Sequence, residues 1–211
     1  MKRSTLHYLY DPLCGWCYAA APLVAIARDL PDIELQLHGG GLMAGANRQA
    51  VSAELRGYVM QHDQRIAALS GQPFGAAYFD GLLRDSGAIF DSEPPTAAIL
   101  AADAIAGRGA ELLARLQQAH YVEGRRIADA SVLQELAADI DLDPGRFAAA
   151  FAAHAGEPTR RHIADSRRRL AAAGGRGFPT FIVERDGHSR VLDASACLGQ
   201  PERWQAELLR P

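Results

Sequence analysis

The chain has 211 residues, of which 48% are hydrophobic, and its formal net charge at pH 7 is −3. A chain of this length can form one enlarged domain or two closely packed ones, and this hydrophobic fraction is sufficient for a core. The slightly negative charge argues against a general role in binding nucleic acid or a membrane surface.

The first predicted elements are a short strand over residues 5–10 and an apolar helix over residues 14–30. The helix opens with Cys14-Gly15-Trp16-Cys17. Pro22 lies inside the apolar run and predicts a kink because it lacks a backbone N–H; a second, separate helix beginning there is the alternative. A Cys-x-x-Cys motif between a strand and a helix indicates a site of thiol–disulfide exchange.

The two cysteines are expected to have different roles. Only a thiolate attacks a disulfide, and the pKa of an ordinary cysteine thiol is about 8.5. Unpaired N–H groups and the positive end of the helix dipole stabilise a thiolate at the start of a helix. We therefore expect Cys14 to be exposed and to attack the substrate. Cys17, one turn further along, is expected to be more buried and to release the reduced product.

The dipeptide between the cysteines affects how oxidising the pair is. Gly15 and Trp16 supply no positive charge. A helix start can lower a thiol pKa from about 8.5 to about 7, which requires roughly 2 kcal/mol. A strong oxidant requires about 7 kcal/mol, and the motif contains no source for it. We therefore expect a moderately reducing pair with a reductase or isomerase role.

The next predicted element is a strand that pairs with the first one. Residues 33–37 alternate between apolar and polar side chains, which predicts a half-buried strand. The order strand, helix, strand implies a parallel pair with a right-handed crossover. Gly39-Gly40-Gly41 follows and lacks the ending of a phosphate-binding loop, so we interpret it as a flexible exit from the sheet.

Helical signals dominate between residues 47 and 151. Helices are predicted over residues 48–70, 94–107 and 111–121. A further helix is predicted to end at residue 139, and Ser131 and Gln134 form a candidate capping box at its start. Asp143 and Pro144 are the predicted N-cap and first residue of the next helix.

The C-terminal part returns to a mixed pattern. A helix is predicted over residues 158–173, followed by strands over residues 179–184 and 190–194. Asp186-Gly187 predicts a hairpin turn between these strands. A short helix over residues 201–209 ends the chain. The sheet is therefore expected to be mixed, with a parallel pair and an antiparallel hairpin.

Three segments together resemble one protein family. They are residues 10–18 around the cysteine motif, residues 121–127 at a helix junction, and Gly177-Phe178-Pro179-Thr180 before a strand. With Pro22 eight residues after the first cysteine, they resemble the thioredoxin superfamily. The helical stretch between the two halves is similar to its DsbA-like branch, and in particular to the predicted cytosolic disulfide-isomerase group.

The resemblance implies an α/β, thioredoxin-like fold with a large inserted all-helical domain. Residues 1–45 and 155–211 would form the thioredoxin-like domain, and residues 46–154 the insertion. It also implies that Pro179 is cis and lies against the cysteine pair, with the Phe178 backbone offered to an extended substrate peptide. We assign Thr180 to the same substrate-binding turn.

One position departs from the family pattern. Many relatives carry a buried acid six residues before the first cysteine, which helps to deprotonate the second, and here that position is Tyr8. Asp11 is the nearest carboxylate. It either serves as a displaced proton acceptor or begins the turn that Pro12 completes, and the turn is the favoured interpretation.

Trp16 has two interpretations, as a substrate contact or as a cap that shields the disulfide. A large aromatic residue between two redox cysteines is expected to be exposed, which favours substrate contact.

Several other residues have an ordinary structural explanation that we favour. Six arginines that precede Gly177 would favour acidic partners if they bordered Cys14, but a solvated helix face is the simpler interpretation. Cys197 is expected to be a small buried hydrophobe rather than a second redox group. Five aromatic residues either line a groove or pack in a helical core, and core packing is favoured for each. The arginines are 160, 161, 167, 168, 169 and 176, and the aromatic residues are Tyr58, Phe74, Tyr78, Phe79 and Tyr121.

We predict a cytoplasmic thiol–disulfide oxidoreductase or protein disulfide isomerase. Three cysteines are too few for a disulfide-rich secreted fold, and no uncharged run reaches the roughly 20 residues that span a bilayer. No apolar segment before Cys14 is long enough for a signal peptide. A zinc site would need two further ligands, usually a second close pair, so no metal is expected.

No bound cofactor is needed for this chemistry. Glutathione or another redox protein must recycle the pair, as a redox partner or a cosubstrate. The expected partners are protein or peptide thiols and disulfides, and neither nucleic acid nor a membrane is expected.

Two other functions fit parts of the pattern. A glutathione-dependent isomerase or transferase of the kappa and hydroxychromene-carboxylate type resembles this architecture. Such proteins carry a serine at the nucleophile position, so the intact Cys14 and Cys17 weigh against this alternative. A non-enzymatic, redox-gated chaperone would instead use the cysteine pair as a switch.

Overall fold

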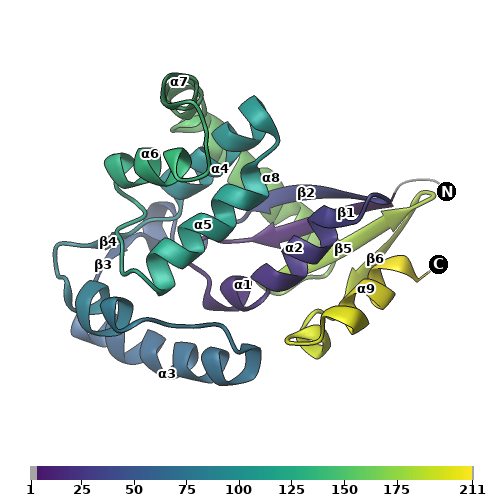
Figure 1. The fold of residues 1–211 in the computed structure, drawn as a ribbon, viewed down its shortest axis with the longest axis horizontal. Coiled ribbons are helices and arrows are strands. Elements are labelled where there is room, and N and C mark those ends of the chain that lie inside the picture. The colour runs from purple at the N-terminus through teal and green to yellow at the C-terminus, as the bar shows by residue number, and fades with distance from the viewer. Residues whose placement is uncertain (1–3, 211) are drawn as a thin grey trace.

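The computed structural model describes residues 4–210 and has a four-stranded sheet at its centre (Figure 1). The strands are β1 (Ser4–Tyr10), β2 (Ile33–Gly39), β5 (Thr180–Arg185) and β6 (His188–Leu192), in the order β2-β1-β5-β6. β1 pairs in parallel with β2 and antiparallel with β5, and β5 pairs antiparallel with β6. The predicted mixed sheet is confirmed.

The hairpin between β5 and β6 turns where the sequence predicted it. Asp186 and Gly187 both adopt positive φ, at 49° and 78°. This is the conformation that a tight two-residue hairpin turn requires, and it suits Asp-Gly.

The first predicted helix is two helices, α1 (Gly15–Ala19) and α2 (Ala21–Asp29), and not one kinked helix. Ala20 joins them, and its N–H bonds to the carbonyl of Trp16. Pro22 lies in the first turn of α2, where its missing N–H breaks no helical hydrogen bond. The proline therefore begins a helix, as the alternative interpretation had it.

Short elements and helices lead from β2 to β5. They are η1 (Gly45–Asn47), β3 (Gln49–Ala50), α3 (Ala53–Ser70), η2 (Ala77–Gly81), η3 (Leu82–Arg84), β4 (Ile89–Phe90), α4 (Glu93–Ala106), α5 (Gly109–Tyr121), α6 (Ala130–Ala138), α7 (Pro144–His154) and α8 (Glu157–Ala172). After β6 come η4 (Ser195–Cys197) and α9 (Pro201–Leu209). In Figure 1, α2 and α9 lie in front of the sheet and α8 lies behind it.

The predicted capping residues of two helices can be compared with the structure. The Asp143 side chain accepts the N–H of Arg146 and caps α7, as predicted. The Ser131–Gln134 capping box is wrong, because α6 already begins at Ala130 with Asp129 as its N-cap. Helix α3 likewise begins at Ala53, later than expected, because the preceding residues pair with β4 as strand β3.

Strand β1 carries large side chains into the main core. The ring of Tyr8 stacks on Phe181 with centroids 4.5 Å apart, and Trp204 meets Phe181 edge-on at 5.0 Å. The same hydrophobic cluster includes Leu116 of α5 and Phe147 of α7. The sheet and the helical segment therefore share one core.

A second, smaller cluster packs beside α1 and α3. It contains Tyr78 and Tyr121, both almost completely buried, with Phe74 and Phe79 at its edge. Core packing is thus confirmed for the two tyrosines, whereas Tyr58 is 66% exposed. Among residues 4–210, none of the helices combines the length and apolar character that crossing a membrane requires.

Candidate active site

Cys14 is the N-cap residue of α1, directly after the turn that follows β1. Its sulfur accepts the N–H of Cys17 at 3.4 Å and donates to the carbonyl oxygen of Phe178 at 3.5 Å. The Cys14 side chain is 7% exposed, so the expectation of an exposed sulfur is wrong. The Phe178 turn lies against this sulfur through the hydrogen bond to the Phe178 carbonyl.

Cys17 lies deeper than Cys14 and is fully buried, in the predicted order. Its sulfur accepts the backbone N–H of Asp11 at 3.5 Å. Burial, followed by the hydrogen bond to Cys14, raises the pKa of Cys17 well above that of an ordinary thiol. Cys17 is therefore a protonated thiol at neutral pH in the reduced protein, and its attack requires a proton acceptor.

The turn before β5 has the geometry that the resemblance implied. The Phe178–Pro179 peptide bond is cis. The carbonyl of Phe178 faces the sulfur of Cys14. The hydroxyl of Thr180 donates to the carbonyl of Gly177 at 2.8 Å, which ties the turn to the start of β5.

A groove lies beside this turn. Its volume is about 580 Å³, and small-molecule sites span about 300–1,000 Å³. Trp16, Phe178, Pro179 and Thr180 line one part of it. The groove therefore brings together the four residues that the sequence assigned to substrate binding. Trp16 is half-buried rather than exposed, because its ring also packs against the main core.

The rest of the groove is polar. Arg176 lines it near the cis peptide, and Asp193 and Ser195 line it from the segment after β6. The groove thus offers a cation, an anion and hydroxyl groups on one binding surface, together with Trp16 and Phe178. Such a set can orient a zwitterionic or peptide-like ligand.

The glycine triplet after β2 is part of the site and not a flexible exit from the sheet. Gly40 donates its N–H to the carbonyl of Tyr10 at 2.7 Å. A Cβ placed on Gly40 would lie only 1.9 Å from the Phe178 ring. Arg167 donates to the carbonyl oxygens of Gly40 and Gly41, at 2.8 and 2.5 Å.

The arginine cluster therefore has several roles, and the solvated-face interpretation is incomplete. Arg167 holds the glycine segment, Arg176 lines the groove, and Arg160 pairs with Glu93 at 3.1 Å. Arg161, Arg168 and Arg169 are exposed on α8.

Asp11 is completely buried beside the cysteine pair. Its carboxylate accepts the N–H of Leu13 at 2.9 Å, which is the predicted turn. It also accepts the N–H of Leu42 at 2.5 Å and the hydroxyl of Ser92 at 2.9 Å. Burial raises the pKa of Asp11 to about 6, and these hydrogen bonds limit the rise.

Tyr8 occupies the position at which many relatives carry an acid. Its hydroxyl donates to the carbonyl oxygen of Cys17 at 3.3 Å. Burial raises the pKa of Tyr8 well above its usual value, so it stays protonated at neutral pH. It supports the backbone of α1 and cannot replace the missing carboxylate as a base.

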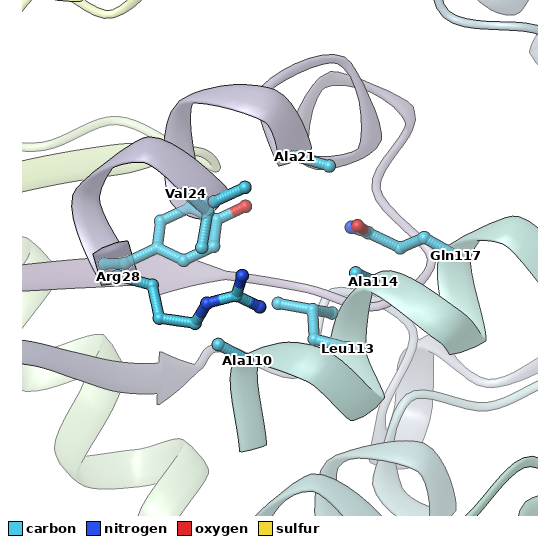
Figure 2. Close-up of a pocket in the computed structure, with 9 residues that line it drawn as sticks. Ala21, Val24, Arg28, Ala110, Leu113, Ala114 and Gln117 are labelled. Carbon is cyan, nitrogen blue, oxygen red and sulfur yellow. The ribbon is translucent and has the colours of Figure 1, made fainter. Parts of the chain in front are cut away.

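A second cavity lies behind Tyr8, between α2 and α5 (Figure 2). Arg28 of α2 and Gln117 of α5 point into it from the two helices. Its volume is about 20 Å³, enough for about one water molecule. This cavity is too small for a substrate. The groove beside Phe178 is the candidate binding site because the cis-proline turn and Trp16 line it.

Sequence reasoning missed Ser92 and Asp63, which the fold brings to the site from segments distant in the chain. It named Arg167 but favoured a solvated helix face for it, whereas Arg167 holds the glycine segment. No local motif signals such contacts. Cys197 is buried in the main core, as expected. Within residues 4–210, no group of three or more His, Cys, Asp or Glu side chains is arranged to hold a metal ion.

The chain is similar to known proteins over most of its length. Residues 5–198 match the family described as a DSBA-like thioredoxin domain. A search of the curated proteins finds no match. The cytosolic disulfide reductase DsbM from Pseudomonas aeruginosa is 60% identical, with a TM-score of 0.91 over 97% of this chain and 96% of that one.

Two further solved structures are similar. DsbM from Pseudomonas aeruginosa with GSH is 58% identical, with a TM-score of 0.89 over 97% of this chain and 96% of that one. A putative protein disulfide isomerase from Nitrosomonas europaea is 24% identical, with a TM-score of 0.79 over 99% and 96% of the two chains. At that identity the likeness concerns the fold.

Proposed function

The chain belongs to the DSBA-like thioredoxin domain family and is a thiol–disulfide oxidoreductase; from this premise we propose that it is a cytoplasmic disulfide reductase recycled by glutathione. The observation that carries the proposal is the position of the Cys14 sulfur. It lies between the N–H of Cys17 and the carbonyl of Phe178, next to a groove of substrate size. The cytoplasmic location follows the 60% identical relative, which is named a cytosolic reductase.

In the proposed reaction, the thiolate of Cys14 attacks one sulfur of a substrate disulfide. The substrate S–S bond breaks, a mixed disulfide with Cys14 forms, and the leaving sulfur takes up a proton. Cys17 then attacks the sulfur of Cys14 and passes its proton to an acceptor. The second substrate thiol leaves, so the substrate gains two electrons and the protein carries a Cys14–Cys17 disulfide.

Asp11 is the proposed proton acceptor for Cys17. The backbone N–H of Asp11 contacts the Cys17 sulfur, and a pKa of about 6 leaves the carboxylate mostly ionised at pH 7. A base with a pKa near the working pH is well suited to accept and return a proton.

Glutathione is the proposed electron donor. Two glutathione thiols give up two electrons to the Cys14–Cys17 disulfide and leave as one glutathione disulfide, while their protons pass to the cysteines. The groove supports this assignment, because Arg176 and Asp193 can meet the carboxylates and the ammonium group of this tripeptide. Phe178 and Pro179 are the proposed contacts for the thiol-bearing segment, with Trp16 and Thr180 beside them.

The test combines a redox titration with two serine variants. Equilibration in glutathione buffers, with alkylation read by mass, should give a potential of about −220 to −270 mV. Cys17→Ser should accumulate a mixed disulfide with glutathione at Cys14, and Cys14→Ser should accumulate none.

Three outcomes would contradict parts of the proposal. A potential near about −120 mV would mark an oxidase instead. The absence of a reversible dithiol–disulfide transition would remove the redox mechanism. Glutathione-dependent turnover of a small aromatic substrate that survives Cys17→Ser would favour the transferase alternative.

A further inference from the structure

Asp63 is a buried carboxylate that reaches the cysteine motif from helix α3. Its side chain is 5% exposed, and one oxygen accepts the hydroxyl of Tyr78 at 2.8 Å. The other oxygen lies over Gly15, so close that a Cβ on Gly15 would be 2.6 Å away. The carboxylate of Asp63 therefore lies directly against the residue that follows Cys14.

This arrangement is costly for the fold. Within the described part of the chain, Asp63 forms no ion pair, and Tyr78 offers it a neutral hydroxyl. Burial raises the pKa of Asp63 to about 6, so the group still carries a negative charge at pH 7. The neighbouring His62 acts to lower this pKa but forms no ion pair with Asp63, and a buried charge without an ion pair destabilises a protein. The position next to the redox motif suggests what the charge contributes.

Tyr121 links Asp63 electrostatically to the cysteines. Burial raises the pKa of Tyr121 well above its usual value, and charges on Tyr78, Asp63, Cys14 and Cys17 add to the rise. One buried hydroxyl is therefore within electrostatic reach of both the carboxylate and the sulfurs. A negative charge so placed disfavours a second negative charge nearby.

We propose that Asp63 is a positioning residue that acts on the redox motif: its buried charge beside Gly15 opposes the negative charge that reduction places on the cysteines and keeps the Cys14–Cys17 pair reducing. The inference rests on the proposed function, because it concerns the same sulfurs. Reduction breaks the neutral disulfide by adding two electrons, and one proton goes to the sulfur of Cys17, so one negative charge is left on the pair. Because the carboxylate raises the energy of that anionic reduced form and leaves the disulfide almost unaffected, it favours transfer of electrons to substrate.

The first test is the isosteric variant Asp63→Asn, which removes the charge and keeps an oxygen for Tyr78. The equilibrium with glutathione should shift several-fold toward the reduced pair, and a full tenfold shift corresponds to about 30 mV. Alkylation of Cys14 at pH 7 should become several-fold faster, because the carboxylate no longer opposes negative charge on the attacking sulfur.

The pH dependence separates this electrostatic role from a structural one. The carboxylate of Asp63 is neutral below about pH 6, so the parent should then behave like Asp63→Asn. The ratio of the two alkylation rates should approach one as the pH falls through about 6. The groups that face Asp63 are Gly15 of α1, Tyr78 of η2 and Tyr121 of α5, with His62 beside it on α3.

Two further variants serve as controls. Asp80→Asn removes the same charge from an exposed carboxylate, 65% accessible and paired with Arg84, and should leave the potential unchanged. Tyr78→Phe removes the hydrogen bond that lowers the pKa of Asp63, so Asp63 should lose its charge at a higher pH than in the parent. The alkylation rates of Tyr78→Phe and the parent should then differ most just above pH 6, and this comparison does not need Asp63→Asn to fold.

The outcomes distinguish the two proposals. If the parent exchanges normally with glutathione but Asp63→Asn has an unchanged potential and alkylation profile, the inference about Asp63 is overturned and the proposed function stands. If the parent shows no reversible exchange, the proposed function fails, whatever the variant does.

Discussion

Asp11 combines a local role with a role that depends on burial. Its contact with the N–H of Leu13 is the ordinary geometry of a turn and follows from the sequence. Its contacts with Leu42 and Ser92 arise only in the fold, and they enclose the carboxylate completely. Asp11 is therefore a turn residue whose pKa burial raises to about 6, near the physiological pH range.

The variant Asp11→Asn should slow the second chemical step. Without a proton acceptor, attack by Cys17 on the mixed disulfide should be about 100-fold slower, the lower end of what a general base contributes. In the parent, this step should lose rate as the pH falls through about 6, where Asp11 becomes protonated. Rapid-quench alkylation across pH 5 to 8 measures both effects. An unchanged rate and pH profile in the variant would exclude Asp11 as the acceptor.

Asp11 also makes the free energy of unfolding depend on pH. The pKa of Asp11 rises from 3.8 to about 6 on folding, so its stabilising contribution is present below about pH 4 and lost as the pH rises through 6. Asp11→Asn does not titrate. Its unfolding free energy should therefore improve relative to the parent by about 2 kcal/mol between pH 4 and pH 8. Urea unfolding at the two pH values checks this. A constant difference would contradict the buried charge.

The glycine segment after β2 connects two elements of the site. Gly40 fits under the ring of Phe178 because it has no Cβ. Arg167 of α8 then closes over the same segment by bonding two carbonyl oxygens. Strand β2, helix α8 and the turn before β5 are thus held together at one point, beside Cys14.

The variant Gly40→Ala should displace Phe178 and weaken substrate binding. The new methyl group would overlap the ring, so KM for a disulfide substrate should rise several-fold and stability should fall by about 1–3 kcal/mol. Gly57→Ala in α3 is the matched control, because nothing lies within 4 Å of its Cβ position. It should leave activity unchanged and stabilise the helix by about 0.5–1 kcal/mol. Equal KM values in the two variants would show that Phe178 tolerates the displacement.

At the scale of the whole molecule, we propose that residues 46–154 are a topological insertion in a thioredoxin-like domain formed by residues 1–45 and 155–211. Residues 1–3 and 211 lie outside the described structure. The main core includes Leu6 of β1 together with Leu116 of α5 and Phe147 of α7. Because the insertion and the sheet share this core, neither part buries its apolar surface alone.

Unfolding should therefore be one cooperative transition. Trp16 and Trp204 both lie in the thioredoxin-like part, so tryptophan fluorescence reports on it, whereas far-UV circular dichroism reports largely on the inserted helices. The two signals should change at the same urea concentration. Loss of helix signal before the fluorescence change would show that the insertion unfolds independently.

The sequence by itself determined the order of the four main-sheet strands along the chain and the redox chemistry of the site, but not the short strands β3 and β4 or the break between α1 and α2. The apolar–polar alternation of the strands, the Asp186-Gly187 turn and the Asp143 cap depend on neighbouring residues, so they could be predicted without the fold. The redox motif is also local, because its two cysteines are three residues apart. The resemblance to a known family supplied the cis turn at Pro179, which spacing alone does not indicate.

Only the tertiary structure decided how the sulfurs are surrounded. The Phe178 carbonyl accepts a hydrogen bond from Cys14, Gly40 makes room for the Phe178 ring, and Asp63 reaches Gly15 from helix α3. These contacts join residues that are far apart in the chain, and no local pattern records them. The charge and burial around a thiol depend on such contacts, because electrostatic interactions act through space rather than along the sequence.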